Sequence, residues 1–336
     1  MKVFVTGHKG FIGTHLVRLL KEAGHTVTGC DLALFAGCEW ESLPKPDHEI
    51  AKDVRTLTVE DIEGHDCVMH LAAISNDPMG DLDEHVTYSI NRDGSIRLAR
   101  LAKAAGVPRF LFAGSCSVYG KKGAAPLDET ASFEPLSAYA KSKVEAEIAI
   151  RELADTTFCP VSLRNATAYG ASPMLRLDLV ANNLLACAYA LGDIRVQSDG
   201  SPWRPLVHCK DIARAFVAFM EAPTHMVHNK AINVGGNSEN YQVKDVADMV
   251  KKLVPTANVV FTGETGADPR SYCVNFDLLA KTLPNFKLEY DLWKGMQELQ
   301  QQFVAHNFNA DDFKGDKYFR LRAIKKTYPL LAHALT

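Results

Sequence analysis

The order of apolar segments over roughly the first half of the chain most constrains how it can fold. Up to about residue 165, short apolar runs alternate with segments whose apolar residues recur at the helical period. This alternation is typical of strand–helix–strand units, in which the strands pair in parallel. We expect strands at 2–6, 26–30, 67–71, 110–114 and 161–164, and helices at 11–23 and 96–105. Gly24 and Gly106 follow the two helices, where a left-handed C-cap is common.

A glycine-rich turn joins the first expected strand to the first expected helix. Residues 6–13 read TGHKGFIG, so the glycines follow the spacing G-x-x-G-x-x-G. The first glycine permits a tight turn, the second lets backbone N–H groups approach a diphosphate, and the third permits close helix–strand packing. A plain glycine-rich turn is the alternative. The position between strand and helix favours a dinucleotide site.

An aspartate follows the second expected strand. Asp31 stands eighteen residues after Gly13, where a carboxylate can accept a hydrogen bond from the 2′-hydroxyl of an adenine ribose. The same carboxylate repels a 2′-phosphate, although Lys9 in the turn is a nearby cation. The sequence therefore predicts NAD rather than NADP as the cofactor, with a simple turn residue as the alternative role for Asp31.

The fold class and the domain bounds follow from these patterns. We expect an α/β protein with a Rossmann-type doubly wound parallel sheet and a smaller, interleaved α/β substrate domain. The pattern loosens after Gly170, and a strand followed by a helix returns over 205–220. The expected NAD-binding domain therefore covers 1–171 with 204–235 returning to it, and the substrate domain covers 172–203 and 236–336. A length of 336 residues is sufficient for two such domains.

Composition excludes several classes of partner. Lys and Arg number 37 against 40 Asp and Glu, so the chain has no overall positive field to hold a nucleic acid. It has no apolar run of about 18 residues and no apolar leader, so we expect a cytoplasmic protein with no membrane partner. The eight cysteines show no metal-ligand spacing and predict reduced thiols and no metal site.

A tyrosine, a lysine and a serine form the expected catalytic set. Tyr139 and Lys143 are four residues apart in an expected helix, so they share one face. A lysine ammonium stabilises a neighbouring phenolate, which can then accept a proton. Ser115 follows an expected strand at the carboxyl edge of the sheet, where open parallel sheets bind ligands. Its hydroxyl could hold a substrate oxygen beside the phenol, as hydride transfer at a secondary alcohol requires.

With these residues, the sequence resembles the extended short-chain dehydrogenase/reductase family, and within it the NAD-dependent nucleotide-sugar epimerase and dehydratase group. The resemblance extends over nearly the whole chain. The segments that carry it are 6–13, Asp31, 53–54, 70–73, Asn91, 115–120, Tyr139 with Lys143, 163–164, 203–211 and 268–272.

The resemblance implies a role for each matching residue. Ser115, Tyr139 and Lys143 would be catalytic, and Lys143 would also bind the nicotinamide ribose. The NAD contacts would be Gly7, Gly10, Phe11, Ile12, Gly13, Asp31, Asp53, Val54, Leu71, Ala72, Ala73, Asn91, Tyr139 and Lys143. The substrate contacts would be Ser75, Asn76, Cys116, Ser117, Asn165, Thr167, Arg176, Arg204 and Arg270. Among these, Arg204 and Arg270 match the positions where an arginine holds the diphosphate, with a surface salt bridge as the alternative for each.

Departures from the family pattern bear on the reaction. Cys116 and Ser117 stand where 4,6-dehydratases usually carry an Asp-Glu pair, and Ser117 stands where the decarboxylases usually carry Glu. Both chemistries are therefore disfavoured. Cys116 is also one position out of register for the acid/base cysteine of 3,5-epimerising relatives, so we expect it to be a buried small side chain. Many relatives have Asn at Thr167, and Asn165 is displaced from that position by two residues.

The sequence leaves three functions open. The leading hypothesis is an NAD-dependent epimerase that acts on a hydroxyl carbon, C4 by the resemblance, of a nucleotide-diphosphate sugar. The enzymatic alternatives are an NDP-4-keto-deoxysugar reductase and, less favoured, a dehydratase. The non-enzymatic alternative is a regulatory protein that binds the dinucleotide without catalysis.

Two further features concern partners. The resemblance implies a homodimer that pairs through helices over about 91–105 and 138–153. The segment 314–326 carries six Lys or Arg residues, which predicts a solvated helix face or, as the alternative, a site for an anion or acidic partner.

Overall fold

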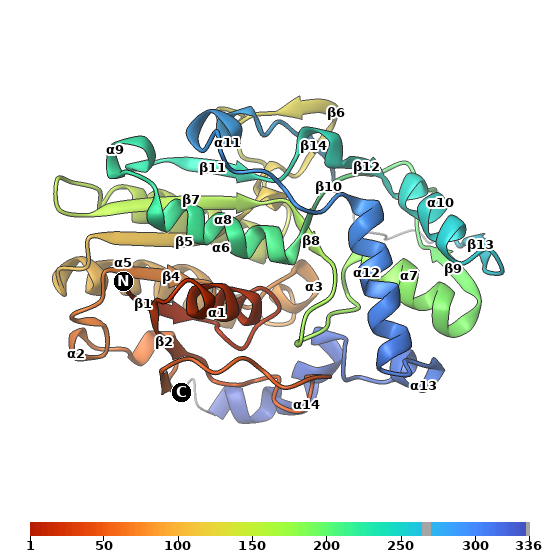
Figure 1. Ribbon diagram of the computed structural model, residues 1–336, viewed down its shortest axis with the longest axis horizontal. Coiled ribbons are helices and arrows are strands. Elements are labelled where there is room, and N and C mark those ends of the chain that lie inside the picture. The colour runs from red at the N-terminus through yellow and green to blue at the C-terminus, as the bar shows by residue number, and fades with distance from the viewer. Residues whose placement is uncertain (264–269, 334–336) are drawn as a thin grey trace.

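A parallel β-sheet lies at the centre of the computed structural model, which describes residues 1–263 and 270–333, with side chains over the same ranges up to Lys326. The sheet has seven strands in the order β11-β7-β5-β4-β1-β2-β3 (Figure 1). Its strands are β1 (Lys2–Thr6), β2 (Thr26–Cys30), β3 (His48–Ile50), β4 (Cys67–His70), β5 (Arg109–Ser115), β7 (Cys159–Asn165) and β11 (Ala231–Val234). This sheet confirms the expected Rossmann-type doubly wound α/β fold.

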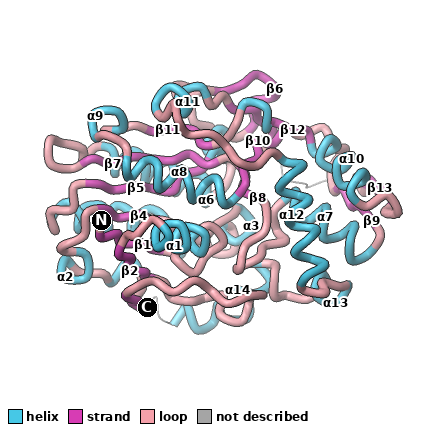
Figure 2. The backbone as a smooth tube through the Cα atoms, in the orientation of Figure 1, coloured by secondary structure: helices cyan, strands magenta, loops and turns pink. Residues whose placement is uncertain are grey.

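Helices cover both faces of the sheet because its strands are apolar on both faces. In β1, Val3 and Val5 pack into one core cluster and Phe4 packs into another on the opposite face. Two helices cover the first face, α1 (Gly13–Glu22) and α8 (Cys209–Glu221), and two cover the second, α5 (Ser95–Ala104) and α6 (Ala138–Arg151). Figure 2 shows α1 and α8 in front of the strands.

The strand order reverses between β1 and β4. The chain runs outward from β1 through β2 to β3 and then crosses to the other side of β1 to form β4. Loops that follow β1 and β4 therefore turn away from each other and leave a crevice at the carboxyl ends of these two strands. This topology places the glycine-rich turn at the ligand-binding edge of the sheet.

The predicted elements agree with the structure where the signal was local. Strands β1 and β2 have the predicted bounds, whereas β5 and β7 are longer than predicted. Helix α1 begins at Gly13 instead of residue 11, because the two preceding residues belong to the glycine-rich turn. Gly24 and Gly106 end α1 and α5 with positive φ angles of 77° and 73°, as expected for C-cap glycines.

A second group of elements packs beside the carboxyl edge of the main sheet. Its β-structure comprises the three-stranded sheet β12-β10-β8 and the pair β13-β9. Its elements are β8 (Thr167–Tyr169), β9 (Asp193–Val196), β10 (Trp203–His208), β12 (Asn240–Gln242), β13 (Asn258–Phe261), α7 (Val180–Leu191), α10 (Val243–Leu253) and α12 (Leu292–Ala305). They have a core cluster of their own, which includes Leu185, Val250 and Phe303. The segment 204–235 thus contributes β10 to this group and α8 and β11 to the main sheet layers. The division into domains at 1–171 with 204–235, and at 172–203 with 236–336, stays a prediction.

The remaining elements are short or lie at the edges. They are the strand pair β6 (Lys121–Leu127) and β14 (Ser271–Val274), the helices α2 (Val59–Ile62), α3 (Asp77–Gly80), α4 (Glu84–Tyr88), α9 (Thr224–Val227), α11 (Asp277–Thr282), α13 (Ala310–Lys314) and α14 (Arg320–His333), and the single turns η1 (Val54–Thr56), η2 (Ser89–Gly94), η3 (Cys116–Tyr119) and η4 (Asn237–Glu239). Over the described ranges, no helix is both long enough and apolar enough to span a bilayer.

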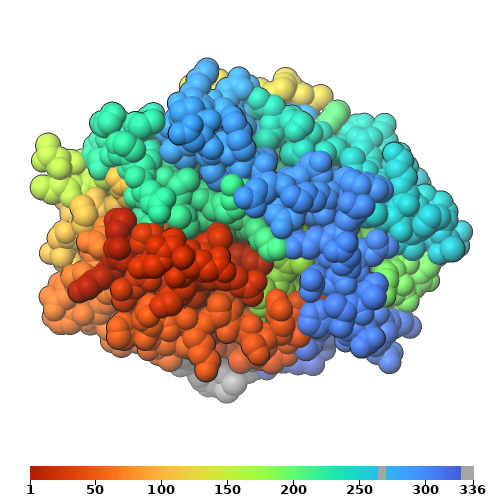
Figure 3. Space-filling view, viewed as in Figure 1, coloured from red at the N-terminus to blue at the C-terminus, as the bar shows by residue number. Residues whose placement is uncertain are grey.

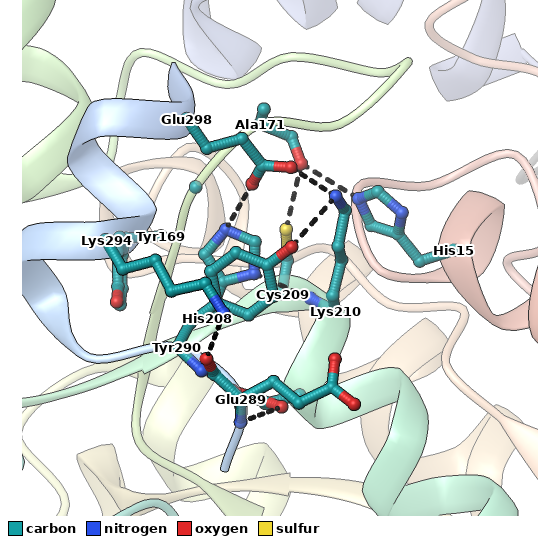
Figure 4. A network of polar contacts seen from close by, with 12 residues as sticks. His15, Tyr169, Ala171, His208, Cys209, Lys210, Glu289, Tyr290, Lys294 and Glu298 are labelled. Atoms are coloured by element: carbon teal, nitrogen blue, oxygen red, sulfur yellow. Dashed lines mark hydrogen bonds and ion pairs between the residues drawn. The ribbon is translucent and has the colours of Figure 1, made fainter. Parts of the chain in front are cut away.

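A polar network joins the two groups of elements (Figure 4). The carbonyl oxygen of Ala171, in the second group, accepts hydrogen bonds from His15 Nε2 at 2.9 Å and Cys209 Sγ at 3.2 Å. Glu298 on α12 forms an ion pair with Lys210, and its other carboxylate oxygen lies 3.1 Å from Nε2 of His208. These contacts fix α12 against the N-terminal end of α8.

Burial keeps His15 neutral at this junction. His15 is 4% exposed, and burial lowers its pKa to about 4, helped by the nearby Lys210 and His208. Because the unfolded chain takes up a proton below the ordinary histidine pKa of about 6.5 and the folded protein does not, stability should fall as the pH drops through this window, by about 1.4 kcal/mol per pH unit for this group. Above the unfolded pKa the contribution is constant.

We therefore expect the variant His15→Gln to lose part of the pH dependence of stability. Glutamine can still donate to the Ala171 carbonyl but does not titrate, so its urea midpoint should fall less than that of the parent between about pH 7 and about pH 5. Replacement of the exposed His48 by Gln is the matched control and should leave the parent slope unchanged. Equal slopes for the parent and His15→Gln would contradict the assignment.

Candidate active site

One large cavity follows the crevice at the carboxyl edge of the main sheet. Its volume is about 1060 Å³, and loops from both groups of elements line it. It is lined by every residue that the sequence predicted for cofactor, substrate or catalysis except Asn91 and Cys116. The cavity therefore brings together the three parts of the predicted site.

The glycine-rich turn fits a dinucleotide diphosphate. Gly7 has a φ angle of 72°, and a Cβ atom there would lie 2.7 Å from the backbone nitrogen of Ala72. A Cβ atom on Gly13 would lie 2.1 Å from the carbonyl oxygen of Gly7. Only glycine permits this close approach of β1, the turn and the loop after β4. The resulting cradle exposes backbone N–H groups at the start of α1 to an anion.

Asp31 is held in place at the end of β2. One carboxylate oxygen accepts the backbone N–H of Lys9 at 3.1 Å, and the other accepts that of Ala33 at 2.7 Å. The carboxylate therefore lies between the glycine-rich turn and the next loop, and it lines the cavity. Asp53 lies nearby, caps η1 and forms an ion pair with Arg55 at 2.6 Å.

Asn91 supports the loop after β4 from behind the cofactor groove. It is fully buried, and its amide binds both backbone groups of Ile74, accepting at 2.8 Å and donating at 2.9 Å. His70 is also buried and binds the hydroxyls of Thr6 and Ser95, and burial lowers its pKa to about 3. These contacts hold the loop after β4, which includes the cavity-lining residues 71–73.

The catalytic residues come from two adjacent elements. Ser115 ends β5 and its hydroxyl caps η3 by accepting the backbone N–H of Ser117 at 3.2 Å. Tyr139 and Lys143 lie in the first two turns of α6, whose N-cap is Ser137. Lys143 is 2% exposed, and its Nζ donates to the carbonyl oxygen of Ala113 in β5 at 2.9 Å. Contact between β5 and α6 therefore sets the geometry of the set.

Burial opposes ionisation of both Lys143 and Tyr139. It lowers the pKa of Lys143 to about 7. It also raises the pKa of Tyr139, and the carboxylate of Asp77 raises it further, while the Ser115 hydroxyl and the cations of Arg176 and Arg270 act in the opposite direction. The protein alone therefore disfavours a phenolate beside an ammonium ion. A cation bound next to Tyr139 would favour the phenolate.

Two arginines from distant segments meet at the substrate side of the cavity. Arg204 lies on β10, and Arg270 directly precedes β14. Arg204 donates to the carbonyl oxygen of Arg270, and the Nη1 atom of Arg270 lies 2.6 Å from a carboxylate oxygen of Asp77. Asp268, which belongs to the same expected motif as Arg270, lies outside the described residues.

Arg176 forms a second charged group in the cavity wall. Its guanidinium makes a two-point contact with Asp178, at 2.9 Å for both bonds, and donates to the Ser75 hydroxyl at 3.1 Å. Asp178 also accepts from the Asn76 amide at 2.6 Å. The backbone of Asn76 has a φ angle of 100°, an uncommon conformation for a residue other than glycine. Polar contacts thus fix the loop after β4 against the second group of elements.

Ser117 and Asn165 supply unpartnered polar atoms to the cavity. The hydroxyl of Ser117 and the Oδ1 atom of Asn165 are buried without a hydrogen-bond partner, and both residues line the cavity with Thr167. Cys116 lies behind them, donates to the carbonyl oxygen of Arg164 at 3.1 Å, and burial raises the pKa of its thiol. A protonated, enclosed thiol is unsuited to acid/base chemistry.

Sequence reasoning did not single out two residues of this cavity. Asp77 follows β4, and nothing in its spacing indicated the contact with Arg270. Arg320 belongs to the basic segment 314–326, for which the sequence predicts a solvated face or, as the alternative, a site for an anion or acidic partner; it is 3% exposed and lines the cavity. The described residues contain no group of three His, Cys, Asp or Glu side chains placed to hold a metal ion.

The model of the NAD dependent epimerase/dehydratase family matches residues 3–235, which is more than half of the sequence. The chain belongs to this family. Membership confirms the resemblance to extended short-chain dehydrogenases/reductases.

Curated relatives of the chain include two UDP-glucose 4-epimerases. The enzyme of Corynebacterium glutamicum is 28% identical over 271 residues, which cover 75% of this chain and 80% of the relative. The enzyme of Mus musculus is 28% identical over 291 residues, which cover 75% of this chain and 82% of the relative.

Solved structures agree with the fold. The NAD-dependent NDP-hexosamine 5,6-dehydratase TunA, involved in tunicamycin biosynthesis, matches with a TM-score of 0.83 at 23% identity, covering 93% of this chain and 99% of TunA. MoeE5, solved in complex with UDP-glucose and NAD, matches with a TM-score of 0.77 at 26% identity, covering 91% and 99%.

We expect the variant Tyr139→Phe to lose at least about a hundredfold in kcat, because the phenol is the assigned proton acceptor for the substrate hydroxyl. Its circular dichroism spectrum and its bound cofactor should match those of the parent. The matched control is Tyr189→Phe, which changes a tyrosine packed between aromatic rings outside the cavity and should keep the parent kcat. Parent-level kcat in Tyr139→Phe would contradict the assigned role.

Proposed function

We propose that this protein is an NAD-dependent epimerase that inverts a hydroxyl carbon, C4 in the simplest case, of a nucleotide-diphosphate sugar. The observation that carries the proposal is the position of Ser115, Tyr139 and Lys143 in the cavity that also contains the dinucleotide cradle and two arginines. The relatives named UDP-glucose 4-epimerase support the reaction, and MoeE5 with UDP-glucose and NAD supports both ligands.

The residues of the chain would divide the work as follows. Bound NAD would supply the hydride acceptor, and as NADH the hydride donor, for the sugar carbon. Tyr139 as phenolate would take the proton of the sugar hydroxyl, and Ser115 would hold the same oxygen by a hydrogen bond. Lys143 as ammonium would stabilise the phenolate, and the positive nicotinamide ring would favour the same ionisation.

Binding of the substrate would use the opposite wall. Arg204 and Arg270 would hold the diphosphate, because a guanidinium matches two phosphate oxygens at once. The diphosphate would then replace Asp77 as the partner of Arg270. Ser117 and Asn165 have unpartnered atoms that hydroxyl groups of the sugar would satisfy. Asp31 would accept the ribose 2′-hydroxyl and exclude a 2′-phosphate, which favours NAD over NADP.

The proposal is tested with a panel of nucleotide sugars incubated with purified protein. We expect one pair of sugars that differ at a single carbon to interconvert, as followed by NMR, while the absorbance of NADH stays unchanged. Net consumption of added NADH or NADPH would indicate the 4-keto-deoxysugar reductase instead. Full biological activity of Tyr139→Phe would indicate a regulatory protein that binds the dinucleotide without catalysis.

Two further proposals concern the setting of the enzyme. We propose a homodimer that pairs through α5 and α6, on which Ile148 is 47% exposed. Sedimentation at micromolar concentration should then give a dimer, and a monomer would contradict the pairing.

We also propose a cytoplasmic location, because all eight cysteines are buried and unpaired, as expected in a reducing compartment.

A further inference from the structure

The C-terminal helix α14 lies across the cofactor side of the cavity, a position that the proposed reaction does not yet use. Residues 319–322 line the cavity together with residues 31–36 of the loop after β2 and residues 71–76 of the loop after β4. These two loops form the two sides of the dinucleotide groove. In Figure 1, α14 runs beneath the β2 side of the sheet, and Figure 3 shows the blue C-terminal part directly against the orange segment that follows β2.

Polar contacts attach the start of α14 to the second group of elements. The Nη2 atom of Arg320 donates to the carbonyl oxygens of Met174 at 3.1 Å and Leu175 at 3.4 Å. The backbone N–H of Leu177 donates to the carbonyl oxygen of Tyr318 at 2.8 Å. The helix is therefore held on the substrate side of the groove.

Apolar contacts attach the next turn of α14 to the cofactor side. Ile324 is 3% exposed and belongs to a small core cluster with Ile74 of the loop after β4 and Met79 of α3. Leu34 and Phe35 of the loop after β2 pack against the same cluster. The helix thus bridges both sides of the groove, and a dinucleotide lying in the groove would be beneath it.

Arg320 brings a buried positive charge to this position. It forms no ion pair with a described residue, its Nη1 atom is buried without a hydrogen-bond partner, and its guanidinium stacks on the Phe35 ring at 4.5 Å. The carboxylate of Asp178, whose charge acts on Arg320, is already held by Arg176 and Asn76. Burial, together with Arg176, lowers the pKa of Arg320 to about 10. A buried cation of this kind is costly unless an anion lies near it.

The segment that holds Arg320 also contacts the glycine-rich turn. The Ser172 hydroxyl donates to the carbonyl oxygen of Phe11 at 2.8 Å, and Met174 lies two residues further on. Phe11 and Met174 line the same cavity. The charge of Arg320 is therefore placed on the side of the groove where the cradle would hold the cofactor diphosphate.

We propose that α14 retains the dinucleotide, with Arg320 as the cation that offsets the charge of its diphosphate. This inference rests on the proposed use of NAD. A cofactor beneath α14 leaves only when the helix separates from both loops, so the hydride taken from one sugar stays in the protein until it is returned. Such retention suits an epimerase, whereas a reductase has to release its oxidised cofactor at every turnover.

The test is the exchange of bound NAD for isotopically labelled NAD, followed by rapid desalting and mass spectrometry. We expect Arg320→Gln to exchange about tenfold faster than the parent, since each 1.4 kcal/mol of lost binding free energy is a factor of ten. Ile324→Asp, which places a charge in the buried contact, should exchange at least about tenfold faster. The readout is independent of catalysis.

The matched control is Lys325→Gln, which removes the same charge from the exposed side of the same helix and should exchange at the parent rate. Hydrogen exchange over residues 320–326 reports whether α14 has separated in Ile324→Asp.

Three outcomes would contradict the inference. The first is parent-rate exchange in Arg320→Gln, which decides the matter even where Ile324→Asp fails to fold. The second is parent-rate exchange in an Ile324→Asp protein whose α14 has separated. The third is equal acceleration by Lys325→Gln. A parent protein that takes up no NAD at all would instead overturn the proposed function, and the inference with it.

Discussion

Burial of the Lys143 ammonium beside Tyr139 is the constraint on which the site depends. Lys143 is enclosed between α6 and β5, and Tyr139 lies half-buried in the cavity wall one helical turn before it. Burial lowers the pKa of the lysine and raises that of the tyrosine. The protein alone therefore holds its proton acceptor in the inactive, neutral form. The positive charge of a bound nicotinamide ring would favour the phenolate form of Tyr139. Binding of NAD would therefore promote ionisation of the proton acceptor.

Much of the fold and of the cofactor site could be predicted because its signals are local in sequence. The glycine spacing of residues 7–13 is fixed by backbone contacts that a single Cβ atom would block, and Asp31 is placed by the end of a short strand. The pairing of Tyr139 with Lys143 follows from the helical repeat. In each case, the spacing within one short segment carries the signal.

The rest depends on contacts between residues far apart in the chain, and spacing carries no information about those. Arg270 meets Asp77 across the cavity, and Arg176 donates to Ser75 in the loop after β4. Arg320 lies in a segment whose composition is typical of a solvated face, but packing of α14 on two loops buries it. The partner of each arginine was set by tertiary structure.

The most direct measurement of the central claim is the fate of deuterium placed at the epimerised carbon of the substrate. We expect the product to retain the label at that carbon, without exchange with solvent, because the hydrogen travels as a hydride to a cofactor that stays bound and then returns. Retention in single-turnover and in multiple-turnover experiments would support the redox-neutral reaction. Loss of the label to water, or its appearance in released NADH, would contradict it.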